Sequence, residues 1–200
     1  MSKLWCPSVE IDSYGGTSVV PLETRMLINR RLFINGVIDA DTANEFIAML
    51  IFLTSDSNEP VTIYINSPGG EVMSGLMIYD AICGADAPIV TVCTGMAASM
   101  AAILLAAGQH GRRYIMPHGK VLIHEPLISD LDGGSATSVM RISKSLLKTR
   151  DVLSEILADH TGKSLKEINS ALADNSFMDA GKAIDFGLCD HFTESLIIKA

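Results

Sequence analysis

Residues 89–108 read IVTVCTGMAASMAAILLAAG, a run of twenty residues without a charged side chain. The run has the length of a membrane span, but Thr91, Cys93 and Ser99 interrupt its apolar character. Its β-branched first part predicts a strand over 89–94, and its Ala-rich second part predicts a helix over 99–107. A buried strand that runs into a buried helix is therefore the better interpretation, and we expect no membrane association.

Strand and helix signals alternate on both sides of this run. Such alternation is typical of right-handed strand–helix–strand crossovers around a buried, largely parallel sheet, so the predicted class is α/β. Residues 1–25 contain Pro and Gly breakers and are expected to form an irregular N-terminal arm. Residues 194–200 are expected to form a C-terminal tail. The further predicted strands are 31–38, 61–66, 113–116 and 120–124, and the further predicted helices are 41–54, 72–85, about 135–160, 165–173 and 179–186.

Composition limits the class of protein. The chain has 200 residues, 48% of them hydrophobic, enough for a single well-packed domain, expected over 26–193. Its net charge of −8 argues against nucleic-acid binding, which draws on clustered cations. The N-terminus has no apolar signal core, which favours a cytoplasmic protein. Three of the four cysteines lie in apolar runs, which suggests reduced, buried thiols; the four are Cys6, Cys83, Cys93 and Cys189.

Ser99 is the first candidate for chemistry, because it is predicted to lie at the turn from a strand to a helix among small residues. Small neighbours allow a substrate backbone to approach, and the first N–H groups of the helix have no intrahelical acceptor. This arrangement suits a nucleophile whose product is an oxyanion. The alternative is a serine that only caps the helix. The stretch is not G-x-S-x-G, so an α/β-hydrolase elbow is not indicated.

His124 and the stretch Ser67-Pro68-Gly69-Gly70 each follow a predicted strand. A histidine there is more often structural, but together with Ser99 it forms the pair that general-base catalysis requires. The paired glycines are either a plain turn or a place where a backbone N–H faces an oxyanion. The other histidines show no ligand spacing, so no metal site is expected.

Five strings carry a resemblance to a known family. YINSPGG (64–70), GMAASM (95–100), LLAAG (104–108), IHEPL (123–127) and HTG (160–162) occur in this order over nearly the whole chain. The sequence resembles the ClpP family, the proteolytic subunits of ATP-dependent Clp proteases. The resemblance implies stacked βαβ units of the ClpP/crotonase type, with a long handle helix at about 135–160. It further implies a tetradecamer of two stacked heptameric rings that encloses a chamber for polypeptide substrates.

The resemblance also implies roles for individual residues. Ser99 would be the nucleophile and His124 the general base, and the N–H groups of Gly70 and Met100 would form the oxyanion hole. Met96 and Met100 would line an apolar pocket for the substrate side chain before the cut, unless they only pack the core. The chain has no cofactor motif and no G-x-x-x-x-G-K-[ST], so ATP would be hydrolysed by a partner AAA+ unfoldase.

Three positions depart from the family pattern. Asn175 takes the place of the aspartate that fixes the histidine tautomer, and such an exchange lowers turnover in a serine protease by about 10⁴. Asp174 replaces an arginine that helps to join the rings, and Thr62 replaces an aromatic residue of the pocket for the docking loops of the ATPase. We therefore expect weak intrinsic activity, in rings of this chain alone or mixed with another ClpP paralogue.

Two other functions stay open at this point. Asn175 favours a structural ring subunit that supports a second paralogue, whereas the presence of both Ser99 and His124 opposes it. An acyl-CoA enzyme of the crotonase superfamily would share the fold and the oxyanion hole. The IHEPL string and the Ser99/His124 pair argue against that alternative.

Overall fold

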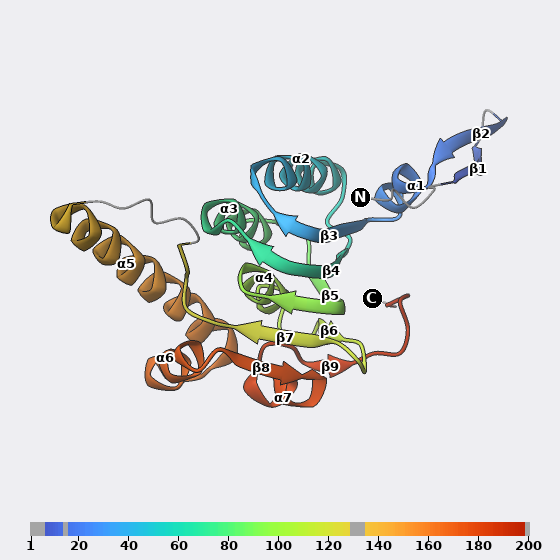
Figure 1. The fold of residues 1–200 in the computed structure, drawn as a ribbon. Coiled ribbons are helices and arrows are strands. Elements are labelled where there is room, and N and C mark those ends of the chain that lie inside the picture. Colours follow the sequence, from blue (N-terminus) through green and yellow to red (C-terminus); the bar gives the residue numbers. More distant parts are fainter. Residues whose placement is uncertain (1–6, 14–15, 129–134, 199–200) are drawn as a thin grey trace.

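The chain is described here from a computed structural model that covers residues 7–13, 16–128 and 135–198. Cys6 lies outside the described residues. Helices and strands alternate along the chain, and Figure 1 shows the successive strand–helix units stacked on one another. In chain order the elements are β1 (Ser8–Ser13), β2 (Gly16–Pro21), α1 (Leu22–Ile28), β3 (Arg31–Ile38), α2 (Ala40–Asp56), β4 (Val61–Gly70), α3 (Val72–Cys83), β5 (Ile89–Ala98), α4 (Met100–Ala106), β6 (Arg113–Ile115), β7 (Lys120–Ile123), α5 (Ala136–Thr161), α6 (Leu165–Ala173), β8 (Ser176–Asp179), α7 (Ala180–Phe186) and β9 (His191–Phe192).

The main sheet confirms the predicted α/β class. Its strand order is β3-β4-β5-β6-β9, and β7 pairs with both β5 and β8. All these pairings are parallel except that of β7 with β8. Parallel strands need crossover connections, and α2, α3 and α4 supply them.

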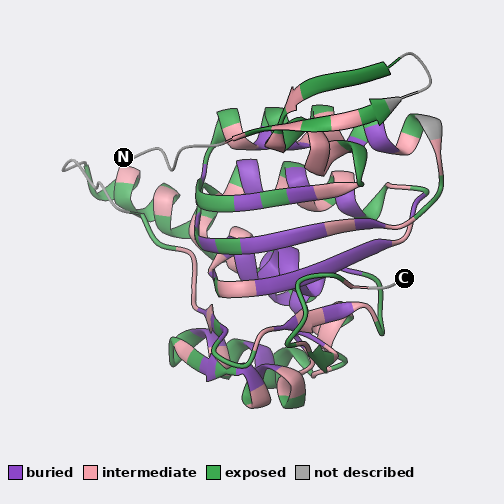
Figure 2. Cartoon of the chain, turned by 90° about the vertical axis from the view of Figure 1, so that its right-hand side faces the viewer, coloured by how far each residue is buried: buried purple, intermediate pink, exposed green. Residues whose placement is uncertain are grey.

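The stretch 89–108 forms the centre of the molecule. The first five residues of β5 are buried, as is every residue of α4 from Met100 to Ala106. Figure 2 shows this burial through the middle of the sheet, in contrast to the exposed β1–β2 hairpin. Small side chains let α4 approach the sheet and its neighbour α3 closely: a Cβ on Gly75 of α3 would lie 2.6 Å from Met100 Cε. The prediction of a buried strand and a buried helix is confirmed, and none of the described helices is long and apolar enough to cross a membrane.

Three expectations about secondary structure are wrong. Residues 8–13 and 16–21 pair as antiparallel strands and 22–28 form a helix, where an irregular arm was expected over 1–25. The short period-two alternation in SVEIDS was obscured by nearby Gly and Pro. β4 and β5 continue beyond 66 and 94 to Gly70 and Ala98, with a register shift in their pairing. β8 was not expected, because its four residues gain strand structure only by pairing with β7.

The expectation of buried thiols holds for two of the three cysteines in the described part of the chain. Cys93 and Cys189 are buried, and burial raises the pKa of both thiols, to about 11 and about 12. Cys83 is exposed, because it lies at the last position of α3.

A buried arginine joins the end of the long helix α5 to the sheet. Arg113 in β6 is 3% exposed and pairs with Asp190 through an Nη2–Oδ1 distance of 2.6 Å and an Nε–Oδ2 distance of 3.0 Å. Its Nη1 donates to the carbonyl of His160 at 2.9 Å. Burial alone would raise the pKa of the Asp190 carboxyl, but the hydrogen bonds and charge of Arg113 outweigh it and the pKa is lowered.

Asp190→Ala should therefore destabilise the fold, because it leaves the Arg113 guanidinium buried without its counter-charge. We expect the free energy of unfolding to fall by about 3 kcal/mol, measured by urea denaturation at pH 7. Asp151→Ala is the matched control, since Asp151 also pairs with an arginine, Arg150, but at the surface, and should change stability little. Equal stabilities of the two variants would contradict the importance of the buried pair.

Candidate active site

Ser99 lies between the end of β5 and the start of α4, as the sequence predicted. Its backbone has φ 56° and ψ −125°, a conformation that non-glycine residues rarely adopt and that costs about 1–3 kcal/mol. The Ser99 N–H donates to the carbonyl of Leu122 in β7 at 2.8 Å. The side chain makes no capping hydrogen bond to α4, so the interpretation of Ser99 as a helix cap is wrong and its hydroxyl is not committed to the backbone.

Gly69 is the residue that packs closest to this turn. It has φ +89°, and a Cβ there would lie 2.5 Å from the Ala98 carbonyl oxygen, 2.7 Å from Ser99 Cβ and 3.1 Å from Met100 N. Both the backbone conformation and the space therefore require glycine. Gly70 follows at the end of β4, where its backbone packs against Ile38. The end of β4 thus meets the start of α4 at Ser99.

Two polar side chains to which the sequence analysis gave no role of their own hold the end of β4 in place. The Ser67 hydroxyl, which is buried, donates to the carbonyl of Gly36 at 2.6 Å and accepts from the N–H of Gly69 at 3.0 Å. Asn66 Oδ1 accepts from the N–H of Met96 at 3.1 Å. In the sequence, Asn66 and Ser67 appear only as two polar residues at the end of an apolar strand. Their role in fixing the end of β4 follows from their contacts in the structure.

His124 follows directly after β7 and shares a small cavity with Ser99. The cavity has a volume of about 20 Å³, room for about one water molecule. Apart from Ser99 and His124 its lining is apolar: Val72, Met100, Ile103, Ile123, Pro126, Leu153, Leu157 and Leu172. Among the described residues there is no hydrogen bond between the Ser99 hydroxyl and His124, a common finding in ligand-free sites whose bonds tighten when substrate binds.

Met96 and Met100 lie in different environments. Met100 is buried, packs against Gly75 and lines the cavity. Met96 is 43% exposed and does not line this cavity, so it does not pack the core, and its role in a pocket for the substrate side chain stays a prediction. Met96 lies at an exposed position of β5, where its backbone is held by Asn66.

Strand pairing brings the segments that carry His124 and Asn175 together. β7 and β8 are antiparallel, with Ile123 opposite Ser176, so His124 directly follows and Asn175 directly precedes this last pair. Asn175 is exposed and has φ 49°, and its N–H donates to the carbonyl of Leu172 at 3.3 Å. The preceding residue, Asp174, ends α6. Ser99 and His124 thus share the cavity, whereas Asn175 is not among the residues that line it.

The described residues contain no group of three or more His, Cys, Asp or Glu side chains that could hold a metal ion. The arrangement instead offers a serine with an uncommitted hydroxyl, an imidazole in the same cavity, and backbone N–H groups near the serine. These are the parts of a nucleophilic acyl-transfer site.

Comparisons with known proteins agree with this chemistry. Residues 15–195 match the family model described as Clp protease. The chain is 38% identical over 185 residues to the ATP-dependent Clp protease proteolytic subunit of Ligilactobacillus salivarius (strain UCC118), an alignment that covers 92% of this chain and 93% of the relative. It is 40% identical over 174 residues to the protein of the same name from Bdellovibrio bacteriovorus (strain ATCC 15356 / DSM 50701 / NCIMB 9529 / HD100), covering 86% of this chain and 82% of the relative.

Gly69→Ala tests whether the close approach of β4 sets the geometry of Ser99. The added Cβ would displace Ser99, and we expect its reaction with a fluorophosphonate probe to slow by about 10²-fold. Gly111→Ala is the control, because Gly111 has a similar φ of +80° with nothing within 4 Å of the new Cβ. The control should lose about 1 kcal/mol of stability but keep its labelling rate, and an equal loss of labelling in both variants would refute the argument.

Proposed function

The chain belongs to the Clp protease family, and from this premise we propose that it is a serine endopeptidase subunit of a compartmental ATP-dependent protease. The observation that carries the proposal is the strained turn at Ser99, which leaves the hydroxyl free of capping bonds in the cavity that also holds His124. Strain of this kind persists only where the surrounding structure imposes it. The contacts of Gly69 and Leu122 impose it here.

In the proposed reaction Ser99 Oγ attacks the carbonyl carbon of a peptide bond while His124 accepts the hydroxyl proton. The N–H groups of Gly70 and Met100 stabilise the oxyanion that forms. His124 then gives the proton to the leaving amine as the C–N bond breaks, which leaves an acyl ester on Ser99. Water, deprotonated by His124, hydrolyses that ester and restores the serine.

Asn175 is expected to make this reaction slow. An amide opposite His124 supplies no negative charge to stabilise the imidazolium, and it can favour the wrong tautomer. Asp174 is one residue away, but it ends α6, and adjacent side chains rarely point the same way. The proposal is therefore a peptidase with weak activity of its own.

The assembly and the partners are part of the same proposal. The subunits would form stacked heptameric rings, with α5 as the handle between the rings, in the cytoplasm. Polypeptides would be delivered by a separate AAA+ unfoldase, because this chain carries no P-loop sequence. Asp174 would change the contact between rings, and Thr62 would weaken the contact with the unfoldase. A ring of another ClpP paralogue is therefore a candidate partner that would dock on this ring and bind the unfoldase in its place.

The second candidate is a mainly structural ring subunit, and Asn175 is the observation that favours it. It would contribute walls and contacts to a mixed assembly whose second paralogue performs the cleavage. A crotonase-type acyl-CoA enzyme is the less favoured alternative, and acyl-CoA binding would be its sign.

Hydrolysis of a short fluorogenic peptide distinguishes the first two candidates. We expect slow hydrolysis by the purified protein and none by Ser99→Ala, with particle size recorded by light scattering on the same samples. A ring of the correct size that is silent alone, and whose mixtures with a paralogue are equally active with the parent chain and with Ser99→Ala, would refute the peptidase proposal and leave the structural role.

Asn175→Asp should raise the rate of peptide hydrolysis, because a carboxylate opposite His124 stabilises the imidazolium. The gain is expected to lie between about 10-fold and about 10⁴-fold in kcat/KM. Asp174→Asn is the control, and it should leave the rate of the parent protein unchanged. A rate that does not rise in Asn175→Asp, or that falls in Asp174→Asn, would assign the support of His124 to another group.

A further inference from the structure

The strand β5 changes its neighbour in the sheet halfway along its length. Residues 91–93 pair with β6, whereas residues 96–98 pair with β7, the strand that His124 follows. Ser99 comes directly after 96–98, and its N–H donates to β7 at the carbonyl of Leu122. The site depends on this change of neighbour, because it brings Ser99 to the strand that leads to His124.

A bulge in β5 lies at the point of the change. On the side of β4 the pairing slips there, so that one residue of β4, Asn66, stands against the three residues 94–96 of β5. Such a bulge bends its strand and re-aims the chain that follows. The chain that follows here is the turn at Ser99. The bulge is therefore the feature that redirects β5 from β6 to β7.

The side chain of Asn66 holds this bulge. Its Oδ1 accepts from the N–H of Met96 at 3.1 Å, so the amide supplies an acceptor where the backbone ladder is interrupted. The bulge also closes around the amide: a Cβ on Gly95 would lie 2.7 Å from Asn66 Oδ1, and its three nearest atoms would all belong to Asn66. The other side-chain bond across the bulge runs from the Thr94 hydroxyl to the carbonyl of Ile65 and is longer, at 3.2 Å.

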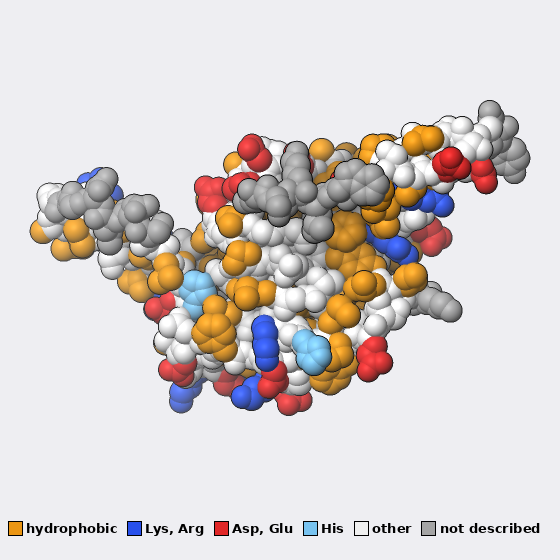
Figure 3. Space-filling model, turned by 45° about the vertical axis from the view of Figure 1, so that its right-hand side comes forward, with side chains coloured by type: hydrophobic (Ala, Val, Ile, Leu, Met, Phe, Trp, Pro, Cys, Tyr) orange, Lys and Arg blue, Asp and Glu red, His pale blue; other side chains and the backbone are white. Residues whose placement is uncertain are grey.

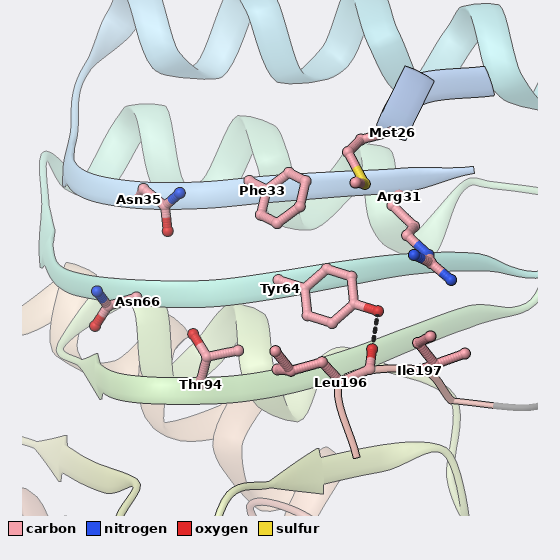
Figure 4. A pocket seen from close by; sticks show the side chains of 9 residues that line it. All are labelled: Met26, Arg31, Phe33, Asn35, Tyr64, Asn66, Thr94, Leu196 and Ile197. Atoms are coloured by element: carbon pink, nitrogen blue, oxygen red, sulfur yellow. Dashed lines mark hydrogen bonds between the residues drawn. The ribbon is translucent and has the colours of Figure 1, made fainter. Parts of the chain in front are cut away.

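Asn66 lies on the surface, on the face of the sheet away from α2, α3 and α4. Figure 4 shows it on β4 beside Asn35 of β3, with Thr94 on the next strand, β5. Figure 3 shows hydrophobic side chains together on this side of the molecule, below the hairpin. Asn35 and Asn66 are both exposed and are partners in the register of β3 and β4, but the Asn35 side chain has no hydrogen bond to any described residue. The two amides therefore differ in the bond to β5.

We propose that Asn66 is a positioning residue for the catalytic pair: through the bulge in β5 its side-chain amide sets the distance between Ser99 and His124. The inference rests on the proposed peptidase function, since only that reaction needs the pair. Asn66 is not among the residues that line the cavity of Ser99 and His124, so it acts through the backbone of Met96. Loss of its bond lets 94–96 relax and moves Ser99 relative to β7, while the buried first half of β5 and the helix α4 keep their packing.

The test measures how fast Ser99 reacts with a fluorophosphonate probe over about pH 5–8, the range in which imidazoles ordinarily titrate. Asn66→Ala should slow the reaction by about 10²-fold, because a displacement of about 1 Å costs that much. Its rate should also lose most of its rise with pH, and its pH profile should approach that of His124→Ala, since a displaced serine is no longer assisted by the imidazole. Asn66→Asp keeps an acceptor oxygen in the same place and should stay within about threefold of the parent.

Gly95→Ala perturbs the same bond from the other side. The new Cβ would push Asn66 Oδ1 away from Met96, so this variant should react slowly as well. In the double variant with Asn66→Ala this clash is absent, and the rate should equal that of Asn66→Ala alone. Losses that multiply in the double variant would show that the two residues act independently and would overturn the proposal.

Asn35→Ala is the matched control, because it removes an exposed amide from the neighbouring strand that has no bond to β5. It should give the rate and pH profile of the parent, and circular dichroism melting should show that all variants are folded. A rate and pH profile of Asn66→Ala equal to those of the parent would overturn the proposal, as would an equal loss in Asn35→Ala.

The failure of the peptidase function is recognised separately, because the parent itself would then not react with the probe. Hydrogen exchange at the Ser99 amide, which is bonded to the carbonyl of Leu122, then decides the positioning alone. Faster exchange in Asn66→Ala than in the parent and in Asn35→Ala would support the role of Asn66, and unchanged exchange would overturn it.

Discussion

The contact between Gly69 and the Ser99 turn is the constraint on which the site depends. A strand end and a helix start can approach this closely only because no side chain stands between them. The approach forces Ser99 into its left-handed conformation and places the Met100 N–H near the end of β4. The positions of Ser99 and of the Met100 N–H are thus set by packing of backbone against backbone, which is rigid, rather than by flexible side chains.

The surroundings maintain this contact from both sides. Ser67 and Asn66 fix the end of β4 through hydrogen bonds to Gly36, Gly69 and Met96. On the other side α4 is buried over its whole length, so the first turn of this helix cannot shift without moving the core. The strain at Ser99 is therefore offset by hydrogen bonds and burial that lie outside the cavity itself.

The two faces of the main sheet are covered differently. The helices α2, α3 and α4 cover one side of β3, β4 and β5. On the other side Tyr64, Val90 and Val92 are buried, whereas Phe33 is exposed and lines a cavity with Leu196 and Ile197.

The sequence by itself determined the alternation of strands and helices, the burial of 89–108 and the position of Ser99 at a turn, because these follow from local composition and periodicity. It also identified His124 as a residue at the end of a strand. The resemblance already assigned Asn175 to the position that supports His124, but only the tertiary structure decided that Ser176 lies opposite Ile123, because that pairing depends on β8, a four-residue strand with no local signal. Likewise, the contacts of Ser67 and Gly69 and the hydrogen bond from Tyr64 to Leu196 join segments far apart in the chain. Local residues set the propensity of each segment, but the distances that make a site come from how the segments pack.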